Sequence, residues 1–113
     1  YEQSIIDKFQ IQTITSDTMN NNISKAIKQT KEFLGNDKFH LSIDIDGLDP
    51  RYTPSTGTPV ENGIKIDSLI MLMKNLNNKN KIFTDIVEFN PNLGSTHDRI
   101  LTQNNVKKLI QHV

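Results

Sequence analysis

The chain has 113 residues, which leaves room for a single domain. Its 13 basic residues balance 13 acidic ones, and this lack of net charge argues against nucleic acid or an anionic membrane as the main partner. The absence of cysteine excludes a disulfide framework, a thiolate zinc site and a cysteine nucleophile, and no run approaches the roughly 18 apolar residues of a membrane helix.

The first third of the chain predicts two helices with a short strand between them. Residues 1–8 are weakly helical, and residues 9–15 alternate apolar and polar side chains as a strand does. Residues 16–18 offer N-caps for a helix that ends at Gly35, and its apolar positions follow helical spacing: Ile23, Ala26, Ile27, Thr30 and Leu34. Because the first residue is Tyr1 and not Met, we expect a cut end, with any targeting signal upstream.

The rest of the chain predicts two more strands and two more helices. Residues 39–46 form a short, isoleucine-rich buried strand, and residues 47–63, with three prolines and three glycines, form a long loop of the kind that is usually functional. Asp67 caps a helix with an apolar face of Leu69, Leu72, Met73 and Leu76, and residues 75–81 are a polar connection. Residues 82–89 form the third strand. Thr96 caps a last helix whose apolar face is Val106, Leu109, Ile110 and Val113. Strands separated by helices imply right-handed crossovers and a parallel sheet, so the fold class is α/β.

Asp44 and Asp46 are the first candidate site. Two residues apart on a strand, they face the same way, roughly 7 Å apart, at the carboxyl end where ligands of open α/β sheets bind. Bare carboxylates there repel each other unless a cation lies between them, and hard ions such as Mn²⁺ or Mg²⁺ prefer oxygen ligands. The alternative is that they serve as caps or loop anchors. A calcium loop of the EF-hand type is excluded, because the positions that need glycine and glutamate hold Asp49 and Ser55.

Glu88 is the second candidate, at the end of the third strand. If the strands are neighbours, its carboxylate points into the same rim as Asp44 and Asp46, as a third metal ligand or as an acceptor for a cationic substrate. It is equally open to a structural role, bound to loop amides. The loop 53–59 either lines a pocket or is only a stiff turn. We interpret His40 as a structural histidine, and His97 and His112 as solvated.

Residues 40–50 (His-Leu-Ser-Ile-Asp-Ile-Asp-Gly-Leu-Asp-Pro) and 52–60 (Tyr-Thr-Pro-Ser-Thr-Gly-Thr-Pro-Val) together resemble the C-terminal signature of the ureohydrolase family. Residues 88–94 (Glu-Phe-Asn-Pro-Asn-Leu-Gly) resemble a second segment of that family, and within it both stretches look most like arginase.

The resemblance implies a three-layer αβα fold with a parallel sheet and a centre of two Mn²⁺ ions per active site. Asp44 would bridge both ions and Asp46 would bind one. A metal-bridging hydroxide would attack the guanidinium carbon of L-arginine to give L-ornithine and urea. Glu88 would hold the guanidinium by paired hydrogen bonds, and Thr58 would line the substrate site. The catalytic set is therefore Asp44, Asp46 and Glu88. The resemblance further implies a cytoplasmic homotrimer that binds neither nucleic acid nor membrane.

The sequence also departs from the family pattern. The remaining metal ligands of the family lie in upstream Gly-Gly-Asp-His and Asp-Ala-His-x-Asp motifs, and this sequence contains neither. We therefore expect residues 1–113 to be the C-terminal portion of a single domain, about a third of an enzyme, inactive by itself. Asp67 and Ser68 stand where the family has an Arg-Glu pair that helps the trimer. Two alternatives remain open: an agmatinase or another guanidino-compound hydrolase, and a non-catalytic fragment of the same fold.

Overall fold

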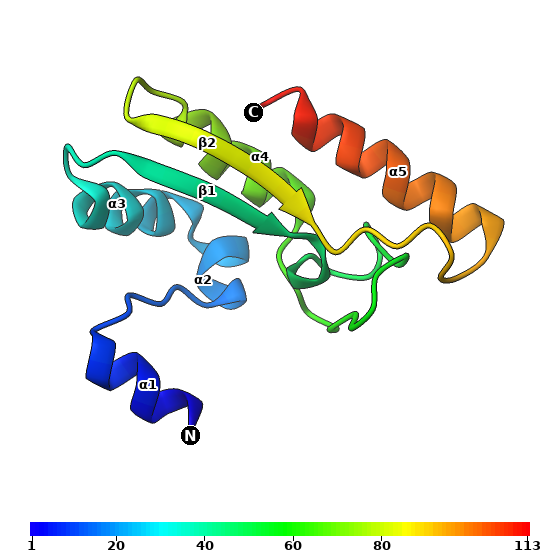
Figure 1. The fold of residues 1–113 in the computed structure, drawn as a ribbon, viewed down its shortest axis with the longest axis horizontal. Coiled ribbons are helices and arrows are strands. Elements are labelled where there is room, and N and C mark those ends of the chain that lie inside the picture. Colours follow the sequence, from blue (N-terminus) through cyan, green and yellow to red (C-terminus); the bar gives the residue numbers. More distant parts are fainter.

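The computed structural model describes residues 1–113, with the sheet at its centre (Figure 1). The strands β1 (Phe39–Asp44) and β2 (Lys81–Val87) pair in parallel, with Asp44 opposite Val87. Between them the chain passes through a short 3₁₀ turn η1 (Ile45–Gly47), a long loop and helix α4 (Ile66–Leu76). The predicted α/β class with a parallel sheet is confirmed.

Helices α4 and α5 (Thr96–Ile110) cover one face of the sheet. The hydrophobic core beneath them is formed by seven buried side chains: Ile43, Ile45, Leu48, Ile66, Leu69, Met73 and Leu109. Side chains alternate along β1, so Leu41 and Ile43 face this core while His40, Ser42 and Asp44 lie on the exposed face. The predicted apolar faces are partly confirmed: Leu109 is buried, but Ile110 and Val113 are exposed.

The predicted helix over residues 16–34 is two helices, α2 (Ser16–Asn21) and α3 (Ile23–Leu34). Asn22 separates them because its backbone leaves the helical region, at φ −146° and ψ 61°, and its side chain accepts a hydrogen bond from the Lys25 N–H. The cap of α2 is Thr15, one residue before the predicted candidates.

The predicted strand over residues 9–15 is wrong. Helix α1 (Glu2–Phe9) extends through Phe9 and ends at Gln10, whose φ of 52° is left-handed. The following residues, up to Thr15, have no regular secondary structure. A strand exists only through hydrogen bonds to a neighbouring strand, and no other strand lies beside this segment, which carries α1 away from the rest of the molecule (Figure 1).

Two predicted caps are displaced by one or two residues. Lys65 is the N-cap of α4, and Asp67 lies in its first turn. Ser95, not Thr96, caps α5, in a reciprocal capping box with Asp98. None of the helices combines the length and the apolar character that crossing a membrane requires.

Candidate functional site at the carboxyl ends of the strands

The predicted site residues meet at one end of the sheet. Asp44 is the last residue of β1, and Glu88 directly follows β2. Because the strands are parallel and Asp44 pairs with Val87, the structure brings Asp44 and Glu88 to the same rim. The long loop after β1 begins at this rim, where Figure 1 shows it beyond the strand ends.

Asp44 and Asp46 do not share a strand face as the sequence predicts. The strand ends at Asp44, and Asp46 lies in the 3₁₀ turn, where its N–H donates to the Asp44 carboxylate at 3.1 Å. The turn therefore folds the two residues against each other. Asp44 is exposed and Asp46 half-buried, which leaves carboxylate oxygens accessible from the rim.

The electrostatics of this rim favour a cation. Partial desolvation is the largest cause that raises the pKa of Asp44, and the negative charges of Asp46 and Glu88 raise it further. The hydrogen bond from the Asp46 N–H opposes these effects without cancelling them. A positive ion or a cationic ligand placed between the carboxylates would remove their mutual repulsion.

Thr58 belongs to the same site through Asp46. Its hydroxyl donates to the Asp46 carboxylate over 2.5 Å, a short and charge-assisted bond that fixes the orientation of the carboxylate. The resemblance to the ureohydrolases implies that Thr58 lines a substrate site. The structure adds a direct contact with a candidate metal ligand, which the sequence pattern does not reveal.

Other hydroxyls of the loop 53–59 are buried and bind backbone. The Thr53 hydroxyl donates to the Ile45 carbonyl at 2.9 Å, and the Thr56 hydroxyl donates to the Glu88 carbonyl at 3.0 Å. Ser55 contacts the segment after β2, where its hydroxyl donates to the Leu93 carbonyl at 2.8 Å. These three residues therefore hold the loop against both strand ends. Sequence reasoning missed their roles, because hydroxyls in a proline-rich loop fit either a pocket lining or a turn.

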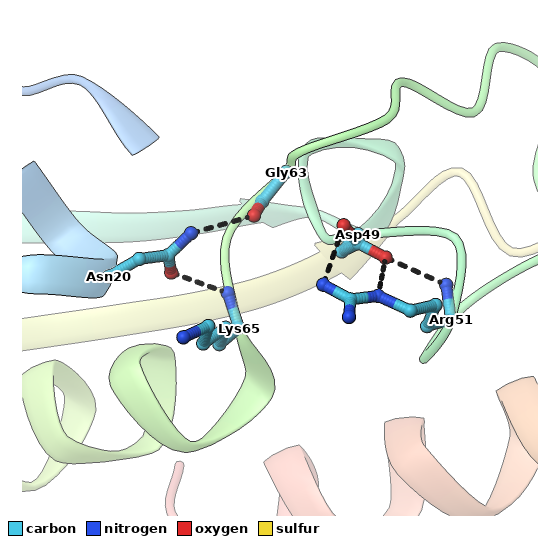
Figure 2. A network of polar contacts seen from close by, with 5 residues as sticks. All are labelled: Asn20, Asp49, Arg51, Gly63 and Lys65. Carbon is cyan, nitrogen blue, oxygen red and sulfur yellow. Dashed lines mark hydrogen bonds and ion pairs between the residues drawn. The ribbon is translucent and has the colours of Figure 1, made fainter. Parts of the chain in front are cut away.

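A second polar network holds the base of the long loop (Figure 2). The side chain of Asn20, from α2, donates to the Gly63 carbonyl at 3.0 Å and accepts from the Lys65 N–H at 2.8 Å. The buried Asp49 carboxylate accepts two hydrogen bonds from the Arg51 guanidinium, at 2.8 and 3.2 Å, and these bonds lower the pKa of Asp49. The network lines a polar hollow of about 300 Å³. The network was not predicted: the bonds of Asn20 join residues more than 40 positions apart, and the Asp49–Arg51 pair is local but carries no sequence signal of its own.

The histidines are peripheral to the site. His40 lies on the exposed face of β1, where its Nε2 contacts the Asp85 carboxylate of β2 at 3.0 Å. The contact joins the two strands and agrees with the predicted structural role. His97 is exposed and His112 half-exposed, in line with solvated side chains.

The oxygen ligands at the rim are of the type that a hard divalent ion binds, but this chain supplies too few of them for a complete site. The carboxylate oxygens of Asp44 and Asp46 are the ligands that Mn²⁺ and Mg²⁺ accept. The chain nevertheless contains no group of three or more His, Cys, Asp or Glu side chains that could hold a metal ion. A metal centre built on this rim therefore needs ligands beyond those that Asp44 and Asp46 supply.

Comparison with known proteins finds similarity to one family of enzymes. The family model described as the arginase family matches residues 1–113. An arginase of Entamoeba histolytica is 40% identical over 81 residues, which cover 71% of this chain and 26% of that protein. An agmatinase of Escherichia coli O9:H4 (strain HS) is 39% identical over 69 residues, or 61% of this chain and 22% of that protein.

The structural comparison agrees with the sequence comparison. A crystal structure of Entamoeba histolytica arginase in complex with L-ornithine superposes with a TM-score of 0.85 and 32% identity, covering 98% of this chain and 38% of that one. The chain thus spans about a quarter of the length of the curated relatives it matches.

Proposed function

The chain belongs to the arginase family, and we propose that it forms the C-terminal part of a manganese-dependent arginase that hydrolyses L-arginine to L-ornithine and urea. The observation that carries the proposal is the rim itself, where Asp44, Asp46 and Glu88 come together at neighbouring strand ends. Three carboxylates with no cation of this chain among their hydrogen-bond partners suit positively charged ligands.

In this proposal Asp44 and Asp46 would hold two Mn²⁺ ions, together with ligands from an N-terminal part of the domain. When bound, such ions supply a nucleophile near neutral pH by lowering the pKa of water. The 3₁₀ turn and the Thr58 hydroxyl fix the directions of the two carboxylates before any ion arrives. Preorganised ligands of this kind lose little freedom on binding.

Glu88 is assigned to the substrate. Its carboxylate accepts no hydrogen bond from this chain and is exposed at the rim, so both oxygens are free to accept from a guanidinium. Paired, charge-assisted hydrogen bonds to a planar guanidinium give orientation as well as affinity. Glu88 therefore holds the reacting carbon near the Asp44 and Asp46 carboxylates.

The test uses the complete protein that contains this chain. We expect it to release urea from L-arginine, and Asp44→Ala and Asp46→Ala each to lose bound manganese and activity. Glu88→Gln should keep its manganese but bind L-arginine at least tenfold more weakly, on the order of 1.4 kcal/mol. Glu61→Gln, at an exposed position of the long loop after β1, is the matched control and should match the wild type. Normal turnover by Glu88→Gln would remove its assigned role.

Agmatine is the second candidate substrate, favoured by the similarity to the Escherichia coli agmatinase. The rim residues do not decide between L-arginine and agmatine, because the side chains that would bind an α-amino acid group are not among them. The same urea assay, run with each substrate, separates arginase activity from agmatinase activity. Urea from agmatine alone would replace arginase by agmatinase. Urea from neither substrate would point to another guanidino compound as the substrate or to a non-catalytic role for the fold.

The proposal includes the assembly and compartment of the complete enzyme, a cytoplasmic homotrimer. The residues at the expected trimer contact are Asp67 and Ser68, so any trimer must use other pairs there. Light scattering on the complete protein measures its mass. A stable monomer would contradict this part of the proposal.

A further inference from the structure

The backbone at Glu88 adopts an unusual conformation. Its φ is +68°, in the left-handed region that residues with side chains seldom enter. Such a conformation persists only where surrounding contacts hold it, and it often occurs at functional sites.

Thr56 supplies the direct contact. The residue is 3% exposed, and its hydroxyl donates to the Glu88 carbonyl at 3.0 Å. The backbone adds a second bond, because the Asn90 N–H donates to the Ser55 carbonyl at 3.1 Å. The two peptide groups that directly follow the Glu88 Cα are therefore bound to adjacent loop residues.

The loop that carries Thr56 is itself fixed. The Ser55 N–H donates to the Thr102 hydroxyl of α5 at 3.0 Å, and the Ser55 hydroxyl donates to the Leu93 carbonyl at 2.8 Å. Both Ser55 and Thr102 are fully buried. These buried hydrogen bonds hold the backbone next to Thr56 in place, so the Thr56 hydroxyl has a fixed position.

We propose that Thr56 is the positioning residue for the Glu88 carboxylate, because its hydroxyl holds the Glu88 backbone in the left-handed conformation that aims the side chain into the rim. The inference rests on the proposed function, in which Glu88 binds the guanidinium. The Glu88 carboxylate has no hydrogen bond of its own within the chain, so the backbone conformation, which sets the direction of the Cα–Cβ bond, decides the side from which the side chain enters the rim. Thr56 acts through Glu88 and does not touch substrate.

The first experiment measures KM and kcat for L-arginine in the complete protein. Thr56→Val removes the hydroxyl and keeps the branched shape, so KM should rise about threefold to tenfold, as expected for one lost hydrogen bond. Thr56→Ser keeps the hydroxyl and should restore KM to within about twofold. Thr30→Val is the matched control: it makes the same change in α3, where the Thr30 hydroxyl donates to the Ala26 carbonyl at 2.9 Å, and should leave KM unchanged.

The second experiment needs no activity. Glycine enters the left-handed region without strain, so Glu88→Gly removes the need for a clamp. The loss in Tm caused by Thr56→Val should therefore be smaller in a Glu88→Gly background than in the wild type. The double variant Thr56→Val with Glu88→Gln should show no KM increase beyond that of Glu88→Gln alone.

The outcomes separate the two proposals. Equal Tm losses in both backgrounds, or a wild-type KM in Thr56→Val, would overturn the positioning role while leaving urea release by the wild type intact. If the wild type released no urea but the Tm losses differed, the clamp on Glu88 would stand and the proposed function would fail.

Discussion

Replacing Gly63 with alanine would separate two segments that the structure packs backbone to backbone. Gly63 lies where the end of the long loop passes beside residues 47–49. There the Asp49 N–H donates to the Ile64 carbonyl at 3.1 Å, and the Ile64 N–H donates to the Gly47 carbonyl at 2.9 Å. A Cβ on Gly63 would lie 2.6 Å from both the Asp49 nitrogen and the Leu48 carbonyl carbon, which are backbone atoms and cannot rotate away.

The size of the effect follows from this distance. Ordinary contact begins at 3.4 Å, so the segments must move apart by about 0.8 Å. That displacement takes both hydrogen bonds beyond the usual range of about 2.7–3.2 Å. Two lost bonds at about 0.5–1.5 kcal/mol each, with overpacking strain of about 1–3 kcal/mol, predict that Gly63→Ala loses about 2–6 kcal/mol of unfolding free energy.

Urea denaturation of the chain at low concentration, followed by circular dichroism, measures this loss. Gly57→Ala is the matched control, because a Cβ there meets nothing within 4 Å and its φ is not in the left-handed region. Gly57→Ala should unfold at the midpoint of the wild type. If Gly63→Ala did the same, the close approach of the loop base to residues 47–49 would be refuted.

Two further predictions concern the chain alone and its pH dependence. The isolated chain should bind Mn²⁺ weakly and release no urea, and micromolar Mn²⁺ binding in calorimetry would contradict this expectation. It should also self-associate through its open sheet edge, and a clean monomer in sedimentation would contradict that. The Ser95 N–H and hydroxyl lower the pKa of Asp98, so its stabilising effect is complete above the unfolded value of about 3.9 and is lost as the pH falls through the lower folded value. The stability difference between wild type and Asp98→Asn should therefore be larger at pH 7 than at strongly acid pH; a pH-independent difference in denaturation midpoints would contradict the capping role.

The sequence correctly predicted the elements that are determined by a local pattern of residues. The helix over residues 66–76 repeats apolar side chains at helical spacing, and its predicted face is the one that packs on the sheet. The strand from Phe39 and the proline- and glycine-rich loop after it are equally local patterns. The sequence predicted Asp44 and Glu88 at one rim on the condition that their strands are neighbours, and the parallel pairing of β1 with β2 meets that condition.

The incorrect predictions concern positions where the outcome depends on another part of the molecule. The alternation in residues 9–15 is typical of a strand, but a strand needs a hydrogen-bonding neighbour, and this segment has none. Asp44 and Asp46 fit strand alternation, yet the chain turns after Asp44 because the Asp44 carboxylate caps the 3₁₀ turn.

By itself, the sequence determined the α/β class, the order of the main elements and the carboxylates at the ends of the strands, since these follow from local periodicity and parallel pairing. Only the tertiary structure decided how those carboxylates are held. The left-handed backbone of Glu88, the Thr56 hydroxyl beneath it and the contact between Thr58 and Asp46 join residues 12 or more positions apart. Hydrogen bonds between such distant residues form only when the chain is folded, and no periodicity along the chain records them.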